Sequence, residues 1–163
     1  MVTIEKFEVR NRWTSLVQFT AEITCAPDAT IGVKLGLAVG WACKSGADLS
    51  GADLSGADLR DFPIKIENIH QRVYEAASAP QALNMGTWHY CDTTHCRAGW
   101  VTTLAGDGGK ALEWAMGTAA AAALIYQASD PSLEQVPNFY CGDAEALEDM
   151  KRMAEAEAAR VPA

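Results

Sequence analysis

Two short segments near the start of the chain are rich in β-branched and aromatic residues. They cover residues 4–10 and 16–23, and residues 11–15 separate them. This pattern predicts a β-hairpin with a five-residue loop. A two-stranded hairpin is only marginally stable alone. We therefore expect it to pack on another part of the chain or on a second copy.

The next segment has the periodicity of a helix. Apolar residues recur at intervals of three and four from residue 29 to residue 44, which predicts a helix that Asp28 or Thr30 caps and Gly46 ends. Three glycines lie four residues apart on one face of this helix: Gly32, Gly36 and Gly40. Each weakens a helix by up to ~1 kcal/mol relative to alanine. We expect this face to admit close approach of the hairpin or of a second helix.

The chain after Pro63 has mainly helical periodicity. Apolar positions from 66 to 77 form an amphipathic stripe that ends before Pro80. Capping residues and glycines then predict four further helices. Their starts are marked by Asp92, Thr118 and Asp143 and their ends by Gly106 and Gly117, which gives segments 93–105, 109–116, 118–128 and 143–160.

A strict five-residue repeat connects the two regions. Residues 47–61 read ADLSG, ADLSG and ADLRD, a period that fits neither helix nor strand. The segment resembles pentapeptide-repeat proteins, in which four pentapeptides make one square coil of a right-handed β-helix. The resemblance implies that Leu49, Leu54, Leu59, Ala47, Ala52 and Ala57 face inward and that Asp48, Asp53 and Asp58 face outward. Three pentapeptides make less than one coil, so we expect a single turn packed on the hairpin or on another subunit.

These patterns together predict an α+β fold in three parts. Residues 1–45 form the hairpin and helix, residues 46–62 form the pentapeptide turn, and residues 63–163 form the helical domain. With 49% hydrophobic residues, the chain of 163 residues can bury an ordinary core.

Charge and composition restrict the possible functions. The net charge of −8 disfavours a nucleic-acid binder, because affinity for phosphates comes from clustered Lys and Arg. No stretch approaches the ~20 apolar residues of a spanning helix, and the charged N-terminus does not resemble a secretory signal. We therefore expect a cytoplasmic location without membrane association, where the five cysteines are reduced thiols or metal ligands.

The densest chemical cluster lies between residues 88 and 100. It holds two histidines and two cysteines within eight residues: His89, Cys91, His95 and Cys96. Tetrahedral zinc takes these ligand types, although the spacing matches no common zinc motif. The alternative is that these residues are core positions packed between Trp88 and Trp100, with no cofactor.

A thiol nucleophile is a further possibility for this cluster. If Asp92 caps the helix, Cys96 lies in the first turn, where the helix dipole lowers a thiol pKa. His89 or His95 would then assist the thiolate. The phosphatase loop H-C-x5-R does not match, because position 102 is Thr.

Two other motifs widen the resemblance. FEVRNRWT at residues 7–14 and TTHCRAGW at residues 93–100 resemble segments of small pentapeptide-repeat proteins carried by bacteriophages and prophages. The resemblance implies a phage or prophage setting, in which small acidic proteins are often accessory factors. The first hypothesis is therefore a non-enzymatic, homo-oligomeric protein that binds and inhibits a host protein or defence complex such as a CRISPR effector. We expect basic partner surfaces to contact acidic positions Asp48, Asp53, Asp58, Asp61, Glu148 and Asp149.

A third hypothesis is a sponge that sequesters a nucleotide messenger at a subunit interface. Arginines can bind phosphates and tryptophans can stack on bases. The candidate residues are Arg10, Arg12, Trp13, Arg97 and Trp100.

Overall fold

The computed structural model describes residues 2–60 and 62–160. Its fold is α+β, as predicted, with a hairpin at the start and mainly helices afterwards. The chain divides into two compact units. The first comprises residues 1–63 with 114–117, and the second comprises residues 64–113 with 118–163. The hairpin, the first helix and the repeat segment therefore belong to one unit.

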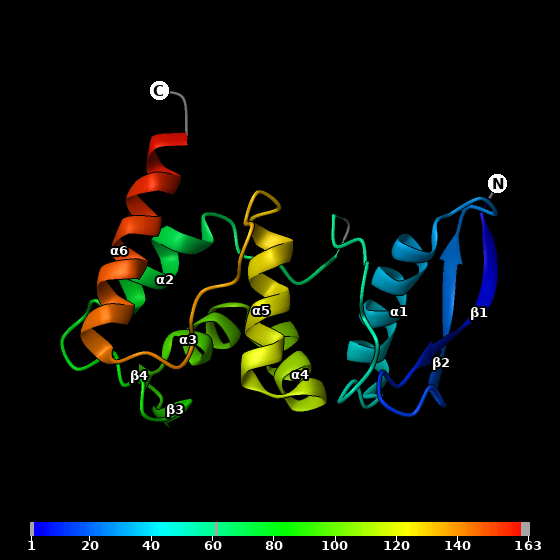
Figure 1. Ribbon diagram of the computed structural model, residues 1–163, viewed down its shortest axis with the longest axis horizontal. Coiled ribbons are helices and arrows are strands. Elements are labelled where there is room, and N and C mark those ends of the chain that lie inside the picture. Colours follow the sequence, from blue (N-terminus) through cyan, green and yellow to red (C-terminus); the bar gives the residue numbers. More distant parts are fainter. Residues whose placement is uncertain (1, 61, 161–163) are drawn as a thin grey trace. The chain divides into compact units, whose positions relative to one another are not determined.

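The predicted hairpin consists of β1 (Thr3–Arg10) and β2 (Val17–Cys25). The strands pair antiparallel from Thr3 opposite Cys25 to Val9 opposite Phe19, and an irregularity follows at Arg10. One face of the hairpin is buried through Val9, Ala21, Ile23 and Cys25. This face packs on helix α1 of the same chain (Figure 1). The marginal stability of an isolated hairpin is thus overcome within one chain.

Helix α1 spans Ile31–Ser45, close to its predicted bounds. Of the two candidate caps, Thr30 caps the helix, since its side chain accepts a hydrogen bond from the Val33 amide. Gly46, with φ of 72°, ends it in the left-handed region.

The face of α1 that carries Gly32 and Gly36 contacts the repeat segment. The expected partner at this face was the hairpin or a second helix. A Cβ atom built on Gly32 would lie 2.5 Å from the carbonyl oxygen of Gly56. A Cβ atom on Gly36 would overlap the carbonyl oxygen of Asp58. The expectation about the partner was wrong at Gly32 and Gly36, because backbone atoms of the repeat approach the helix most closely there.

The repeat segment is a series of identical tight turns. The amide of Ala52 donates to the carbonyl of Leu49 at 3.0 Å, and that of Ala57 to the carbonyl of Leu54 at 3.1 Å. Gly51 and Gly56 have φ of 77° and 75°, the left-handed conformation that such turns require. No β-helix coil forms in the described residues.

Side-chain burial in the turns follows the expected alternation in part. Leu49 and Ala52 are buried, whereas the remaining inward-facing leucines and alanines, Leu54, Leu59, Ala47 and Ala57, are half-buried. Asp48 and Asp53 are exposed, and Asp58 is half-buried. The aspartates at the first two turns therefore face solvent.

The second unit is built from helices. They are α2 (Ile69–Ala77), α3 (Arg97–Leu104), most of α4 (Gly106–Met116), α5 (Thr118–Ser129) and α6 (Asp143–Arg160). Helix α2 packs on α6, and α3 packs on α5 (Figure 1). None of the helices in the described residues is long and apolar enough to cross a membrane.

The prediction that Asp92 begins a helix was wrong. A short hairpin of β3 (His89–Cys91) and β4 (Thr94–His95) occupies this part of the chain, so Asp92 lies in its turn. Helix α3 begins later, and Cys96 is its N-cap, with Sγ accepting from the Gly99 amide at 3.3 Å.

Candidate functional site

The exposed aspartates of the repeat are held in defined positions. Asp48 Oδ1 accepts from the Ser50 amide at 2.8 Å, and Asp53 Oδ1 accepts from the Ser55 amide at 3.1 Å. Hydrogen bonds from the side chain and backbone of Ser55 hold the pKa of Asp53 below its usual range. Both carboxylates are therefore pre-organised. We call the two turns that carry Asp48 and Asp53 the acidic turns.

The loop end of the hairpin fixes the backbone of the acidic turns. The side-chain amide of Gln18 donates to the carbonyl oxygens of Asp48 and Ser50, both at 2.8 Å. The Asp53 amide donates to the Arg10 carbonyl at 2.8 Å. Because strand residues hold both turns, the two carboxylates need little ordering when a partner binds.

The other predicted acidic positions differ in their surroundings. Asp58 forms an ion pair with Arg60 at 2.5 Å, and Asp61 lies outside the described residues. Glu148 is exposed on α6. Asp149 does not present a free carboxylate, because it forms ion pairs with Arg97 at 2.6 Å and with Arg152 at 2.5 Å.

The second unit contains a cavity of about 570 Å³ beside the short hairpin. We call it the histidine cleft; it is lined by His89, Tyr90, Cys91, Asp92, His95, Thr103, Lys110 and Glu113. His89 Nδ1 lies 2.9 Å from His95 Nδ1, and His89 Nε2 lies 2.7 Å from Glu113 Oε1. Burial, followed by the charge of His89, lowers the pKa of His95. The imidazole of His89 is therefore held at the cavity wall between the Glu113 carboxylate and a second imidazole.

The four candidate zinc ligands do not form a tetrahedral site. The Nδ1 atoms of His89 and His95 face each other at hydrogen-bond distance, and Cys96 Sγ is engaged at the start of α3. Cys91 Sγ instead lies 3.5 Å from the Thr93 hydroxyl. Within residues 2–60 and 62–160, no group of three or more His, Cys, Asp or Glu side chains is arranged to hold a metal ion. The arrangement therefore does not fit the zinc alternative.

The expected activation of Cys96 was also wrong. Cys96 is fully buried, and burial raises its pKa rather than lowering it. The neighbouring Cys91 has the opposite environment, since hydrogen bonds from Thr93 and Thr94 lower its pKa to about 7. Sequence reasoning missed the threonines, although both lie within three residues of the thiol.

The residues of the nucleotide hypothesis do not present free phosphate ligands together. Arg97 is 1% exposed, and its guanidinium binds Asp149 and the Tyr126 hydroxyl. Arg10 is paired with Glu8 at 2.9 Å. The indole nitrogen of Trp100 donates to the Ala82 carbonyl. Arg97 is thus a core residue of the second unit.

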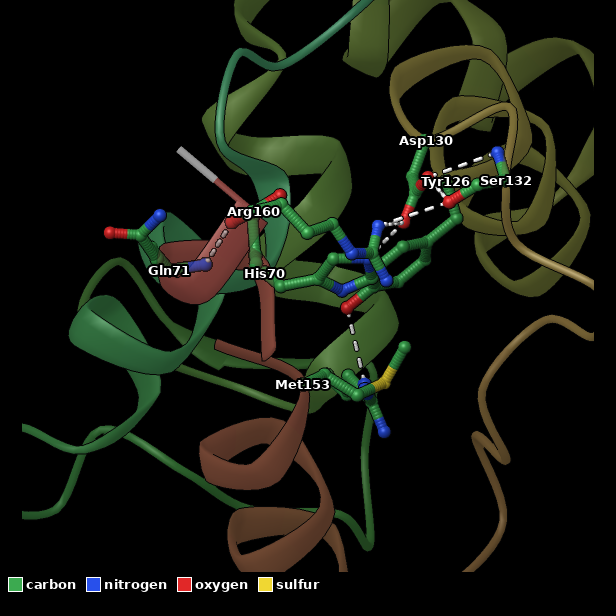
Figure 2. Close-up of polar contacts among 9 residues, drawn as sticks. His70, Gln71, Tyr126, Asp130, Ser132, Met153 and Arg160 are labelled. Carbon is green, nitrogen blue, oxygen red and sulfur yellow. Dashed lines mark hydrogen bonds and ion pairs between the residues drawn. The ribbon is translucent and has the colours of Figure 1, made fainter. Parts of the chain in front are cut away.

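A polar cluster near the end of α5, in which His70 and Asp130 are buried, was not predicted. Figure 2 shows His70, Asp130 and Arg160 directed toward one another. His70 Nε2 and Arg160 Nη1 each lie 3.0 Å from Asp130 Oδ2, and the Ser132 hydroxyl donates to Asp130 Oδ1 at 2.6 Å. Ser132 therefore bonds to the carboxylate and not to the imidazole, and His70 Nδ1 is buried with no hydrogen-bond partner among the described residues. This order of contacts does not make a serine nucleophile; it ties α2 and α6 to the end of α5.

Asp130 is expected to make stability depend on acid pH. Burial acts to raise the pKa of Asp130, but hydrogen bonds from Ser132, His70 and Arg160 outweigh it and lower the pKa to about 2. A depressed carboxyl pKa stabilises the fold above pH ~4 and loses that contribution as pH falls toward the folded-state value. We expect Asp130→Asn to lower the unfolding free energy at pH 7 by roughly 2 kcal/mol and to change it little at pH 2. Urea unfolding at both pH values measures this, and an equal loss at both would contradict it.

Comparison with known proteins identifies one segment. Residues 45–61 match the family model of pentapeptide repeats (8 copies). Neither curated proteins nor solved structures gave a significant match to the chain. The repeat segment is thus of the pentapeptide type, and the match covers only the turns that carry Asp48, Asp53 and Asp58.

Proposed function

We propose that the protein is a non-enzymatic accessory protein of phage or prophage that binds and blocks a basic surface of a host protein or defence complex. The observation that carries the proposal is the pair of acidic turns. Asp48 and Asp53 are exposed carboxylates at the same position of successive repeats, and each accepts a hydrogen bond from the backbone amide two residues further along the chain. The net charge of −8 supports attraction to a basic surface. The bound protein would then inhibit its partner by covering that surface. One example of such a partner is a CRISPR effector whose basic groove binds nucleic acid.

The contacts of the acidic turns favour binding over catalysis. The pKa of Asp53 is lowered, so its carboxylate stays ionised at neutral pH instead of exchanging protons. The carboxylate oxygens of a fixed aspartate accept hydrogen bonds from arginine well. Homo-oligomerisation, which we also propose, would multiply the number of acidic turns presented to one partner.

The proposal predicts that removing two negative charges from the turns weakens partner binding. In the double variant Asp48→Asn/Asp53→Asn, the amide oxygens still accept from the Ser50 and Ser55 amides, so the turns persist. We expect capture of host proteins from lysate by the immobilised protein to fall about tenfold at low salt. Wild-type capture should itself fall steeply as salt rises.

A matched control separates local charge from net charge. The double variant Asp28→Asn/Glu134→Gln removes two exposed carboxylates outside the repeat. It should capture the same partner as strongly as the wild type. Equal loss in both variants, or wild-type binding that does not change with salt, would overturn the electrostatic proposal.

A further inference from the structure

The histidine cleft contains a thiol that has no part in the proposed binding function. Cys91 is exposed and lines the cavity together with His89, His95 and Lys110. A small molecule that enters this cavity therefore meets a sulfur nucleophile, an imidazole held by a carboxylate, and an ammonium group.

The other four cysteines are less exposed than Cys91. All five cysteines lie in the described residues, and Cys25 and Cys96 are buried. Cys43 is half-buried, and burial raises its pKa to about 11. Cys141 is also half-buried, and its thiol donates to the Asn138 carbonyl at 3.6 Å. Among these five, Cys91 alone is exposed. Cys141 lines a separate cavity with Arg97 and Arg152, whereas the cavity beside Cys91 is lined by two imidazole groups and Lys110 together with Asp92 and Glu113.

We propose that Cys91 is a site of thiol–disulfide exchange with small disulfides that carry carboxylates, which enter the histidine cleft beside Lys110. The inference is independent of the acidic turns and stands or falls separately from them. Lys110 provides the positive charge that favours a carboxylate on the incoming disulfide. Glu113 contacts His89 and accepts from the Thr118 hydroxyl. Asp92 also lines the cleft, and its carboxylate favours an ammonium group, which oxidised glutathione carries in addition to its carboxylates.

The exchange needs no reagent besides the disulfide. The Cys91 thiol loses its proton to solvent, and the thiolate attacks one sulfur of the disulfide. A bond forms between Cys91 Sγ and that sulfur, the original S–S bond breaks, and the electron pair leaves with the second sulfur as a thiolate. Cys91 Sγ lies 3.5 Å from the Thr93 hydroxyl, and hydrogen bonding at the sulfur, chiefly with Thr93, lowers the pKa of Cys91 to about 7, so the reactive thiolate is abundant at neutral pH.

Oxidised glutathione provides a direct test on the full chain. Incubation at pH 7 followed by intact mass and peptide mapping should show one glutathione per chain, on Cys91. Cys91→Ser should abolish the adduct, and Cys141→Ser should leave it unchanged. Adducts spread equally over Cys91 and Cys141, or an unchanged yield in Cys91→Ser, would overturn the proposal.

Two further variants test the contacts around the sulfur and the choice of ligand. Thr93→Val should slow the reaction at pH 7 at least about threefold and move its pH midpoint upward, because a thiolate hydrogen bond is lost. Lys110→Gln should slow exchange with oxidised glutathione more than exchange with uncharged 2-hydroxyethyl disulfide. If the pH midpoint of Cys91 lies at 8.5 or above in the wild type, or Lys110→Gln slows both disulfides equally, the assignment fails. Circular dichroism confirms that each variant is folded.

Discussion

Replacing Gly36 with alanine is expected to destabilise the first unit by about 2–3 kcal/mol, although alanine normally stabilises a helix interior. The reason is the contact between α1 and the repeat. The new Cβ atom would overlap the carbonyl oxygen of Asp58, which belongs to backbone and cannot rotate away. The turn that follows Asp53 must then move or separate from the helix.

Gly40 provides the matched control in the same helix. A Cβ atom there would lie 3.8 Å from the ring of Pro63, an ordinary contact distance. Gly40→Ala should therefore raise the unfolding free energy by up to ~1 kcal/mol. Urea unfolding of both variants, followed by circular dichroism, measures the difference. A Gly36→Ala protein as stable as Gly40→Ala would refute the close packing of the turns on α1.

Replacing Arg97 with alanine is expected to cost the second unit about 3 kcal/mol. The guanidinium is almost fully buried and donates to Asp149 at 2.6 Å and to the Tyr126 hydroxyl at 3.1 Å. The substitution leaves a cavity and an unpaired hydroxyl on Tyr126, whose side chain is wholly buried. Thermal or urea unfolding measures the loss.

Arg152 is the control for Arg97, because both arginines contact the same carboxylate. The side chain of Arg152 is 72% exposed, so Arg152→Ala should cost less than about 1 kcal/mol. Burial also acts to raise the pKa of Asp149, but hydrogen bonds from the two arginines hold it below its usual range. Similar losses in the two variants would contradict the assignment of Arg97 to the core.

The sequence predicted those elements whose signal is local. The hairpin, helix α1 and helix α6 follow from alternation, periodicity and capping residues within each segment. The five-residue turns follow from the repeat, and the family match of residues 45–61 supports them. The short hairpin β3–β4 was missed because strands of three and two residues are too short to show alternation.

The site was less predictable because its contacts join distant residues. Arg97 and Asp149 are 52 positions apart, and His89 and Glu113 are 24 apart. Neither pairing leaves a pattern in the sequence. The helix start was misassigned because aspartate is a stronger N-cap than cysteine, yet Asp92 is used in a tight turn. The sequence correctly placed His89 and His95 in one cluster. It did not predict that His89 contacts the Glu113 carboxylate, in place of the expected set of zinc ligands.

The pairing of α2 with α6 has a consequence for synthesis on the ribosome. The contacts of β1, β2 and α1 join neighbouring segments, so these elements can assemble while translation continues. Helix α2 is made early and contacts α3, but its main packing partner, α6, is encoded by residues 143–160. During that interval the part of α2 that packs on α6 in the folded protein lacks its cover. The nascent second unit is therefore most exposed to aggregation until the last helix emerges.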